Sequence, residues 1–122
     1  MKPIRILIVD DLVFMRTAIR EIAESGGLIV AGEAENGREG IQRFLECSPD
    51  VVLMDITMPE MDGITALHRI MTLDPKARVV MCSALGQTEY ILRSIQFGAR
   101  DFVVKPFKPE RLLSAVKRAS RG

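Results

Sequence analysis

The sequence predicts an α/β fold, a parallel sheet of five strands covered on both faces by five helices. Short apolar runs recur along the 122 residues, and segments with apolar residues at helical spacing alternate with them. No linker, repeat or low-complexity stretch interrupts this series. Successive strand–helix units require a parallel sheet with right-handed crossovers. We therefore expect residues 1–122 to form a single domain.

The first part of the chain contains two strands and one helix. A continuous apolar run predicts a strand over Arg5–Val9. A helix follows and stops at Ser25-Gly26-Gly27, because glycine favours helix ends. Its apolar residues at helical spacing are Phe14, Ala18, Ile19 and Ile22. A second strand is predicted over Leu28–Ala31, followed by a turn at Asn36-Gly37.

The middle of the chain repeats the pattern. The second helix has Ile41, Phe44 and Leu45 at helical spacing and ends at Ser48-Pro49, because the residue before proline disfavours the helical conformation. A third strand covers Val51–Met54, and Met58-Pro59 to Asp62-Gly63 is predicted to be a loop. The third helix ends at Asp74-Pro75. Its apolar residues are Ile64, Leu67, Ile70 and Met71.

The last part of the chain completes the five units. The fourth strand covers Val79–Cys82, and the helix after it ends with Gly98 as its C-cap. The apolar residues of that helix are Ile91, Leu92 and Ile95. The fifth strand covers Phe102–Val104, and the last helix begins near Pro109, since proline is favoured in the first helical turn. Its apolar residues are Leu112, Leu113 and Val116.

The common arrangement of such a chain is the doubly wound, flavodoxin-like sheet with strand order 2-1-3-4-5. In this order the first strand lies beside the third, and the chain reverses direction between them. Ligands of open α/β sheets bind at this switch point, outside the carboxyl ends of the strands. We therefore expect the functional residues to follow directly after the strands.

The overall composition excludes several classes of partner. The 17 basic residues are matched by 16 acidic residues, giving a formal charge of +1, so the sequence has no basic character suited to nucleic acid or an anionic membrane. There is no signal peptide or membrane-spanning apolar stretch. Cys47 and Cys82 are not predicted to pair. A reduced, cytoplasmic protein is expected.

Charged residues follow three of the predicted strands. Asp10-Asp11 follows ILIV, Asp55 follows VVLM, and Lys105-Pro106 follows DFVV. Each acid alone is typical of a turn or a helix cap, but three carboxylates and one ammonium at one edge of a sheet indicate a site for a hard cation and a phosphate. The first and third strands are neighbours in the expected order, so the acids should meet.

Four segments of the chain resemble the receiver domain of two-component response regulators. They are VDD at 9–11, MDITMPEMDG at 54–63, CSA at 82–84 and KPF at 105–107. The resemblance runs over essentially the whole chain. Two longer segments, DLVFMR at 11–16 and CSALGQ at 82–87, make the chain most similar to single-domain chemotaxis regulators of the CheY type.

The resemblance implies a phosphorylation site. Asp55 would be the phosphoacceptor and form an acyl phosphate. Asp11 would bind Mg²⁺ directly, Asp10 through water, and the backbone carbonyl of Thr57 would complete the protein ligands. The three carboxylates and Lys105 sum to −2, and Mg²⁺ brings the site to zero. The negative charge added by phosphorylation would be met by Lys105 and Ser83.

The resemblance also implies a switch and its output surface. Phosphate would draw the Ser83 hydroxyl inward and move Phe102. The readout would be the face of the fourth helix, fifth strand and fifth helix, where the expected exposed residues are Tyr90, Arg93, Phe102, Lys108 and Arg111. The Lys105-Pro106 bond is a candidate for the cis isomer.

The expected partners follow from the same resemblance. They are a chemotaxis histidine kinase as donor, the flagellar motor switch as target, and a dedicated phosphatase as a further candidate. The protein is expected to be a monomeric switch rather than an enzyme, although it would assist its own phosphorylation and slow dephosphorylation. Thr57 and Leu85 would set the lifetime of the phosphate.

Three alternative functions differ in what they require. A haloacid-dehalogenase-type phosphatase needs a second aspartate two residues after the nucleophile, and that position is Thr57. A flavodoxin-like nucleotide-binding module needs a Gly-rich or Ser/Thr-rich phosphate loop after the first strand, where this chain has acids. The third alternative is a receiver from a longer regulator with a methylesterase or DNA-binding output. A chain that starts at Met1 and stops just past the fifth helix favours a single-domain protein.

Overall fold

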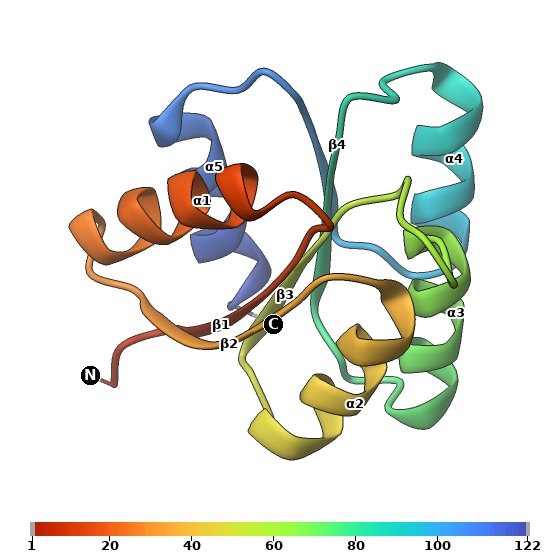
Figure 1. The fold of residues 1–122 in the computed structure, drawn as a ribbon, viewed down its shortest axis with the longest axis horizontal. Helices are drawn as coiled ribbons and strands as arrows, with labels where there is room; N and C mark the ends of the chain where they lie inside the picture. Colours follow the sequence, from red (N-terminus) through yellow and green to blue (C-terminus); the bar gives the residue numbers. More distant parts are fainter. Residues whose placement is uncertain (1, 122) are drawn as a thin grey trace.

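The computed structural model describes residues 2–121, and in them five strands alternate with five helices (Figure 1). The strands form one parallel sheet in the order β2-β1-β3-β4-β5, which confirms the predicted fold class and strand order. The strands are β1 (Arg5–Val9), β2 (Ile29–Ala34), β3 (Val51–Met54), β4 (Val79–Ser83) and β5 (Asp101–Val104). The helices are α1 (Val13–Ser25), α2 (Gly37–Cys47), α3 (Gly63–Leu73), α4 (Thr88–Gln96) and α5 (Pro109–Ala119).

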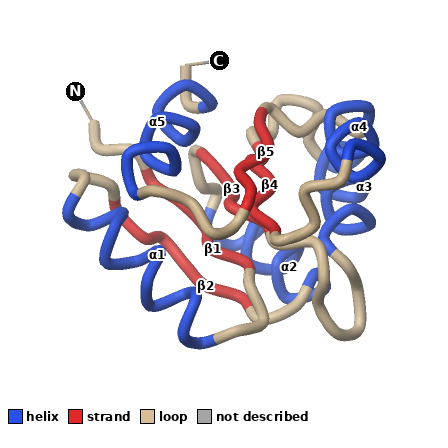
Figure 2. Tube along the Cα trace, turned by 90° about the horizontal axis from the view of Figure 1, so that it is seen from above, coloured by secondary structure: helices blue, strands red, loops and turns tan. Residues whose placement is uncertain are grey.

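The helices form two layers with the sheet between them. Helices α1 and α5 cover one face, and α2, α3 and α4 cover the other (Figures 1 and 2). Side chains alternate between the faces, so in β1 Leu7 joins the core under α2 to α4, while Ile8 joins the core under α1 and α5. Both are fully buried. Strands buried on both faces explain why the sequence shows continuous apolar runs rather than alternation.

Strand β2 begins one residue later than expected and continues to Ala34. The apolar run ended at Ala31 because Gly32 and Glu33 are not apolar, but both pair with β1, at Leu7 and Ile8. Strand β2 is an edge strand, and the Glu33 carboxylate forms ion pairs with side chains of α1. The ladder with the neighbouring strand therefore decides where β2 ends.

The predicted turn at Asn36-Gly37 is the beginning of a helix. Asn36 is the N-cap of α2, and its Oδ1 accepts a hydrogen bond from the N–H of Glu39 at 2.8 Å. Gly37 is the first residue of the helix, and its N–H donates to the carbonyl oxygen of Met61. The same residue types favour turns and helix caps, so the Asn-Gly pair alone did not distinguish them.

Some apolar residues assigned to helices point into solvent. Phe14 is 79 % exposed, and Leu45, Leu92 and Ile95 are also exposed. The helices that carry them are present as predicted, because the remaining apolar positions at helical spacing are buried or partly buried against the two cores. Among the described helices, none is long and apolar enough to cross a membrane.

Candidate functional site

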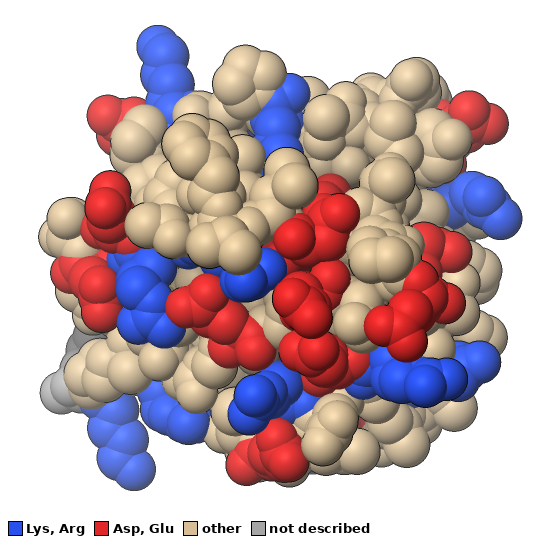
Figure 3. All heavy atoms as spheres, viewed as in Figure 1, with Lys and Arg blue, Asp and Glu red and all other residues tan. Residues whose placement is uncertain are grey.

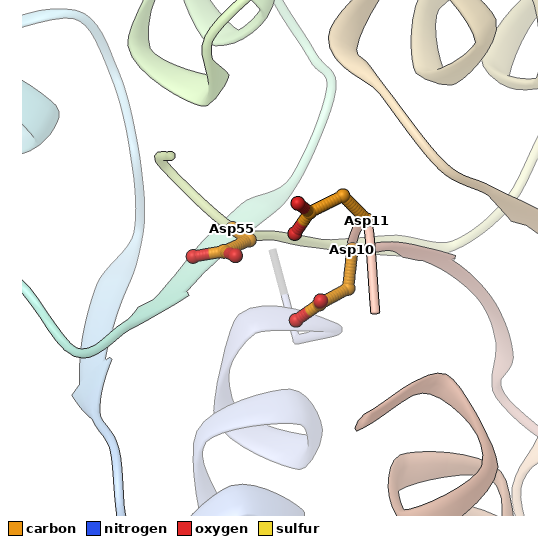
Figure 4. A group of neighbouring side chains, drawn as sticks. All are labelled: Asp10, Asp11 and Asp55. Atoms are coloured by element: carbon orange, nitrogen blue, oxygen red, sulfur yellow. The ribbon is translucent and has the colours of Figure 1, made fainter. Parts of the chain in front are cut away.

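Acidic side chains gather near the middle of the face seen in Figure 3, which is viewed as Figure 1. Asp10, Asp11 and Asp55 form a compact acidic group, because one carboxylate oxygen of each lies within 4.8 Å of the others (Figure 4). Asp10 and Asp11 follow β1 and Asp55 follows β3, and these strands are neighbours in the sheet. The predicted meeting of the three acids at the switch point is confirmed.

Lys105 brings a positive charge to the group from the far edge of the sheet. It follows β5, which is separated from β1 by β3 and β4. Its Nζ lies 2.6 Å from Oδ2 of Asp10 and 3.6 Å from Oδ2 of Asp55. The peptide bond between Lys105 and Pro106 is cis.

Burial and neighbouring charges together shift the pKa values of Asp55 and Lys105. Burial raises the pKa of the Asp55 carboxyl, and the charges of Asp10 and Asp11 raise it further, while Lys105 and the N–H of Ile56 lower it. Burial opposes the charge of the Lys105 ammonium, but its hydrogen bond to Asp10 and the two nearby carboxylates outweigh burial and raise its pKa. Lys105 is therefore held as a cation against a crowded group of acids.

Two of the expected cation ligands, the Asp11 carboxylate and the Thr57 carbonyl, accept no hydrogen bond among residues 2–121. In contrast, Asp10 accepts hydrogen bonds from Lys105 and from the N–H of Leu12. The Asp11 carboxylate also forms no ion pair with any of the described residues. A set of carboxylates with free oxygen atoms fits a hard divalent cation.

Ser83 lies at the end of β4 and is buried. Its Oγ accepts a hydrogen bond from the N–H of Leu85 at 3.1 Å, and its carbonyl oxygen accepts one from the N–H of Lys105. The residue therefore connects the loop after β4 to the end of β5. This places the hydroxyl next to the strand end that carries the cation.

Phe102 was expected among the exposed output residues, and this expectation was wrong. The side chain is 7 % exposed and belongs to the core under α2, α3 and α4, against which Tyr90 and Ile91 also pack. Phenylalanine has no polar end that must reach water, so burying the ring against α4 is favourable.

The other expected output residues occupy two regions, and of them Arg93 and Lys108 are exposed as expected while Tyr90 and Arg111 are half-buried. Tyr90 and Arg93 on α4 line a hollow of about 310 Å³ with residues of the β3–α3 segment, including Thr57 and Asp62. Lys108 is exposed at the N-cap of α5. Arg111 donates two hydrogen bonds of 3.0 Å to the carboxylate of Asp101. The exposed Leu92 and Ile95 add apolar area to α4.

Sequence reasoning missed the side chains that support the loops around the acids. Arg16 on α1 donates to the carbonyl oxygen of Asp10 at 2.6 Å. Asn36, the cap of α2, donates to the carboxylate of Glu60 at 3.1 Å, and Glu60 has a left-handed backbone with φ of 65°. These contacts join segments that are not related by any repeating spacing, so no periodic signal in the sequence could have revealed them.

The fold and the acidic group define a class of protein. Residues 6–117 match the family model described as the response regulator receiver domain, and the chain belongs to this family. Within the family, the chain is similar to the chemotaxis protein CheY. It is 54% identical to the protein of Bacillus subtilis over 114 residues, which cover 93% of this chain and 95% of the relative. It is 50% identical to that of Thermotoga maritima over 117 residues, covering 96% and 98%.

Solved structures agree with this placement. The crystal structure of the CheX–CheY–BeF₃–Mg²⁺ complex from Borrelia burgdorferi contains a chain that matches with a TM-score of 0.92 and 39% identity, covering 95% of this chain and 88% of that chain. The response regulator domain of Thermotoga maritima CheB matches with a TM-score of 0.93 and 34% identity, covering 99% and 98%.

Proposed function

We propose that this protein is a phosphorylation switch of the CheY type that acts in chemotaxis in the cytoplasm. The observation that carries the proposal is the position of Asp55, a buried carboxylate that is grouped with Asp10 and Asp11 and lies 3.6 Å from the Lys105 ammonium. The identities of 50 and 54% to CheY proteins over nearly the whole chain support the chemotaxis role.

Mg²⁺ is the proposed cofactor. The carboxylates of Asp10, Asp11 and Asp55 and the carbonyl of Thr57 would hold it, in keeping with the preference of Mg²⁺ for oxygen ligands and retained waters. When bound, it would neutralise charge on the phosphoryl group during transfer. The similar CheX–CheY complex of Borrelia burgdorferi is a complex with Mg²⁺, which supports this choice.

Residues of the protein would accept the phosphoryl group and stabilise it. A carboxylate oxygen of Asp55 attacks the phosphorus of a phosphohistidine in a histidine kinase. The O–P bond forms as the N–P bond breaks, and the imidazole leaves. The Lys105 ammonium, already 3.6 Å from Asp55, offsets the added negative charge. The Ser83 hydroxyl is the second proposed phosphate contact.

The phosphorylated form would bind the flagellar motor switch. Movement of Ser83 and the Phe102 ring would alter the face of α4, β5 and α5, where Arg93 and Lys108 supply positive charge and Arg111 is paired with Asp101. A dedicated phosphatase is a further proposed partner, supported by the CheX–CheY complex of Borrelia burgdorferi. The protein would act as a monomer, without a nucleic-acid or membrane partner.

A second candidate within the family is a receiver that controls a methylesterase or DNA-binding domain. The 34% identity to the receiver of Thermotoga maritima CheB supports it. This value is well below the 50% identity to the CheY protein of the same organism. We therefore favour the chemotaxis switch.

The chemistry is tested by labelling with acetyl phosphate or a phosphorylated kinase in the presence of Mg²⁺. Asp55→Asn should remove all labelling, because the amide cannot form an acyl phosphate. Asp62→Asn is the control, since Asp62 is exposed and caps α3, a role that asparagine also fills. Base-stable phosphate on the Asp55→Asn protein would contradict the proposal.

A further inference from the structure

The loop that carries the acidic pair is held from outside by one arginine. Arg16 lies on α1, and its side chain is only 13% exposed. Its Nη1 donates to the carbonyl oxygen of Asp10 at 2.6 Å, and its Nε forms an ion pair of 3.1 Å with Glu33 on β2. Among residues 2–121, no other group donates to that carbonyl. The contact fixes the peptide that joins Asp10 to Asp11.

The position of Asp11 depends on this peptide. The side chain of Asp10 is oriented by Lys105 and by the N–H of Leu12, and Asp55 is oriented by the N–H of Ile56. The Asp11 carboxylate has no hydrogen bond or ion pair among the described residues. Its place therefore follows from the backbone of the β1–α1 loop.

We propose that Arg16 is a positioning residue that fixes the β1–α1 loop and thereby holds Asp11 in place for a divalent cation. The inference rests on the Mg²⁺ site of the proposed function. Groups that orient the ligands of a metal from outside commonly contribute 10–100-fold to metal affinity. The rigid, forked guanidinium suits this role because it bonds the loop and β2 at once.

Electrostatics alone predicts the opposite effect of removing Arg16. Loss of a positive charge near three carboxylates makes the site more negative, which favours a cation. A positioning role predicts weaker binding, because Asp11 would have to be ordered when the cation binds. The sign of the change in affinity therefore separates the two effects.

The chain offers a matched control on the same helix. Arg20 also pairs with Glu33, through its Nη2 at 2.6 Å, but makes no contact with Asp10. Arg20→Met removes the same charge and also disturbs Glu33. It leaves the donor to the Asp10 carbonyl in place.

The experiment is a calorimetric titration of each protein with MgCl₂, combined with thermal unfolding with and without Mg²⁺. Arg16→Met should bind Mg²⁺ about 10-fold more weakly or worse, and its unfolding temperature should rise less on addition of Mg²⁺. Arg20→Met should bind as tightly as the wild type or slightly more tightly. Arg16→Lys keeps the charge and one donor, and should recover part of the affinity.

The possible results distinguish failure of the proposed Mg²⁺ site from failure of the positioning role of Arg16. A wild type that binds no Mg²⁺ overturns the proposed metal site, and the inference with it. A wild type that binds Mg²⁺ while Arg16→Met binds equally or more tightly overturns the inference alone, as does an equal loss in Arg20→Met. If Arg16→Met does not fold, Arg16→Lys decides: the inference requires weaker binding than in the wild type, and unchanged affinity overturns it.

Discussion

The central residue is Asp55, which is 8 % exposed and lies beside two other acids. Burial and like charge both raise its pKa, so the metal-free protein holds this group under electrostatic strain. Two unit charges about 5 Å apart repel by about 3 kcal/mol at an effective dielectric constant of about 20. Lys105 relieves part of this repulsion and does so mainly at Asp10.

Asp11→Asn should therefore stabilise the metal-free protein while weakening Mg²⁺ binding. The raised pKa of Asp55 means that the native state binds this proton more tightly than the unfolded chain. The free energy of unfolding consequently falls as pH rises from about 4 through the raised pKa. Removing the charge of Asp11 lowers the Asp55 pKa, and the free energy of unfolding then falls less as pH rises. Thermal unfolding without Mg²⁺ and an NMR titration of the Asp55 carboxyl measure the two effects.

The wild type and a control complete this test. Mg²⁺ at 100-fold excess over its dissociation constant should stabilise the wild type by about 2.7 kcal/mol. Asp62→Asn also removes an acid but leaves the three carboxylates intact, so its metal-free unfolding temperature should stay near that of the wild type. A lower metal-free unfolding temperature for Asp11→Asn would show that the three acids do not repel as described.

At the scale of elements, the site depends on how closely α3 approaches the end of β3. The helix begins at Gly63, whose N–H donates to the carbonyl oxygen of Ile56 at 2.7 Å. A Cβ atom at Gly63 would overlap the carbonyl oxygen of Asp55. This close approach holds the start of α3 against the backbone of Asp55 and Ile56, directly after β3.

Gly63→Ala should destabilise the protein by about 1–3 kcal/mol or more and also slow phosphorylation of Asp55, because the start of α3 must move away from the phosphoacceptor. Gly27→Ala is the control. Gly27 has φ of +83° with open space around it, so alanine is strained there by about 1–2 kcal/mol, far from the acids. Denaturant unfolding and acetyl phosphate labelling report both effects. Equal labelling rates in the two variants would contradict the role of the close approach.

At the scale of the whole molecule, the sheet connects the acids to a surface on α4 and β5. Ser83 pairs with Val104 in the ladder between β4 and β5, and Lys105 follows directly. Phe102 lies on the same strand and is buried against the core under α4. Under the proposed function, a change at Asp55 would reach α4 through these two adjoining strands and the buried Phe102 ring. Such a switch is a shift between two packings, each favoured by one state of Asp55.

Ser83→Ala should leave phosphorylation of Asp55 largely intact but weaken binding to a peptide from the motor switch. The alanine cannot hydrogen-bond the phosphate, so the phosphorylated state no longer favours the altered packing. NMR chemical shifts of residues 88–112 should change on phosphorylation of the wild type and change less in the variant. Wild-type shifts confined to the surroundings of Asp55 would contradict this coupling.

Much of the fold could be predicted because it depends on local patterns. The bounds of β1 and β3 agree with the predicted strands, since strands buried on both faces are apolar along nearly their whole length, with Arg5 at the start of β1 as the exception. The meeting of Asp10 and Asp55 also followed, because a parallel sheet brings the carboxyl ends of its strands to one edge. The sequence by itself therefore determined the strand order and the meeting of the three acids at one edge of the sheet.

Only the tertiary structure decided which groups contact one another. It placed Lys105 closer to Asp10 than to Asp55, across 95 positions of sequence, and it buried Phe102 beside α4. It also joined Arg16 to the carbonyl of Asp10, a contact with a backbone atom that every residue possesses. Sequence patterns indicate which residues of a single strand or helix are buried. A side-chain contact depends in addition on how separate elements pack, and that is settled only when the chain is folded.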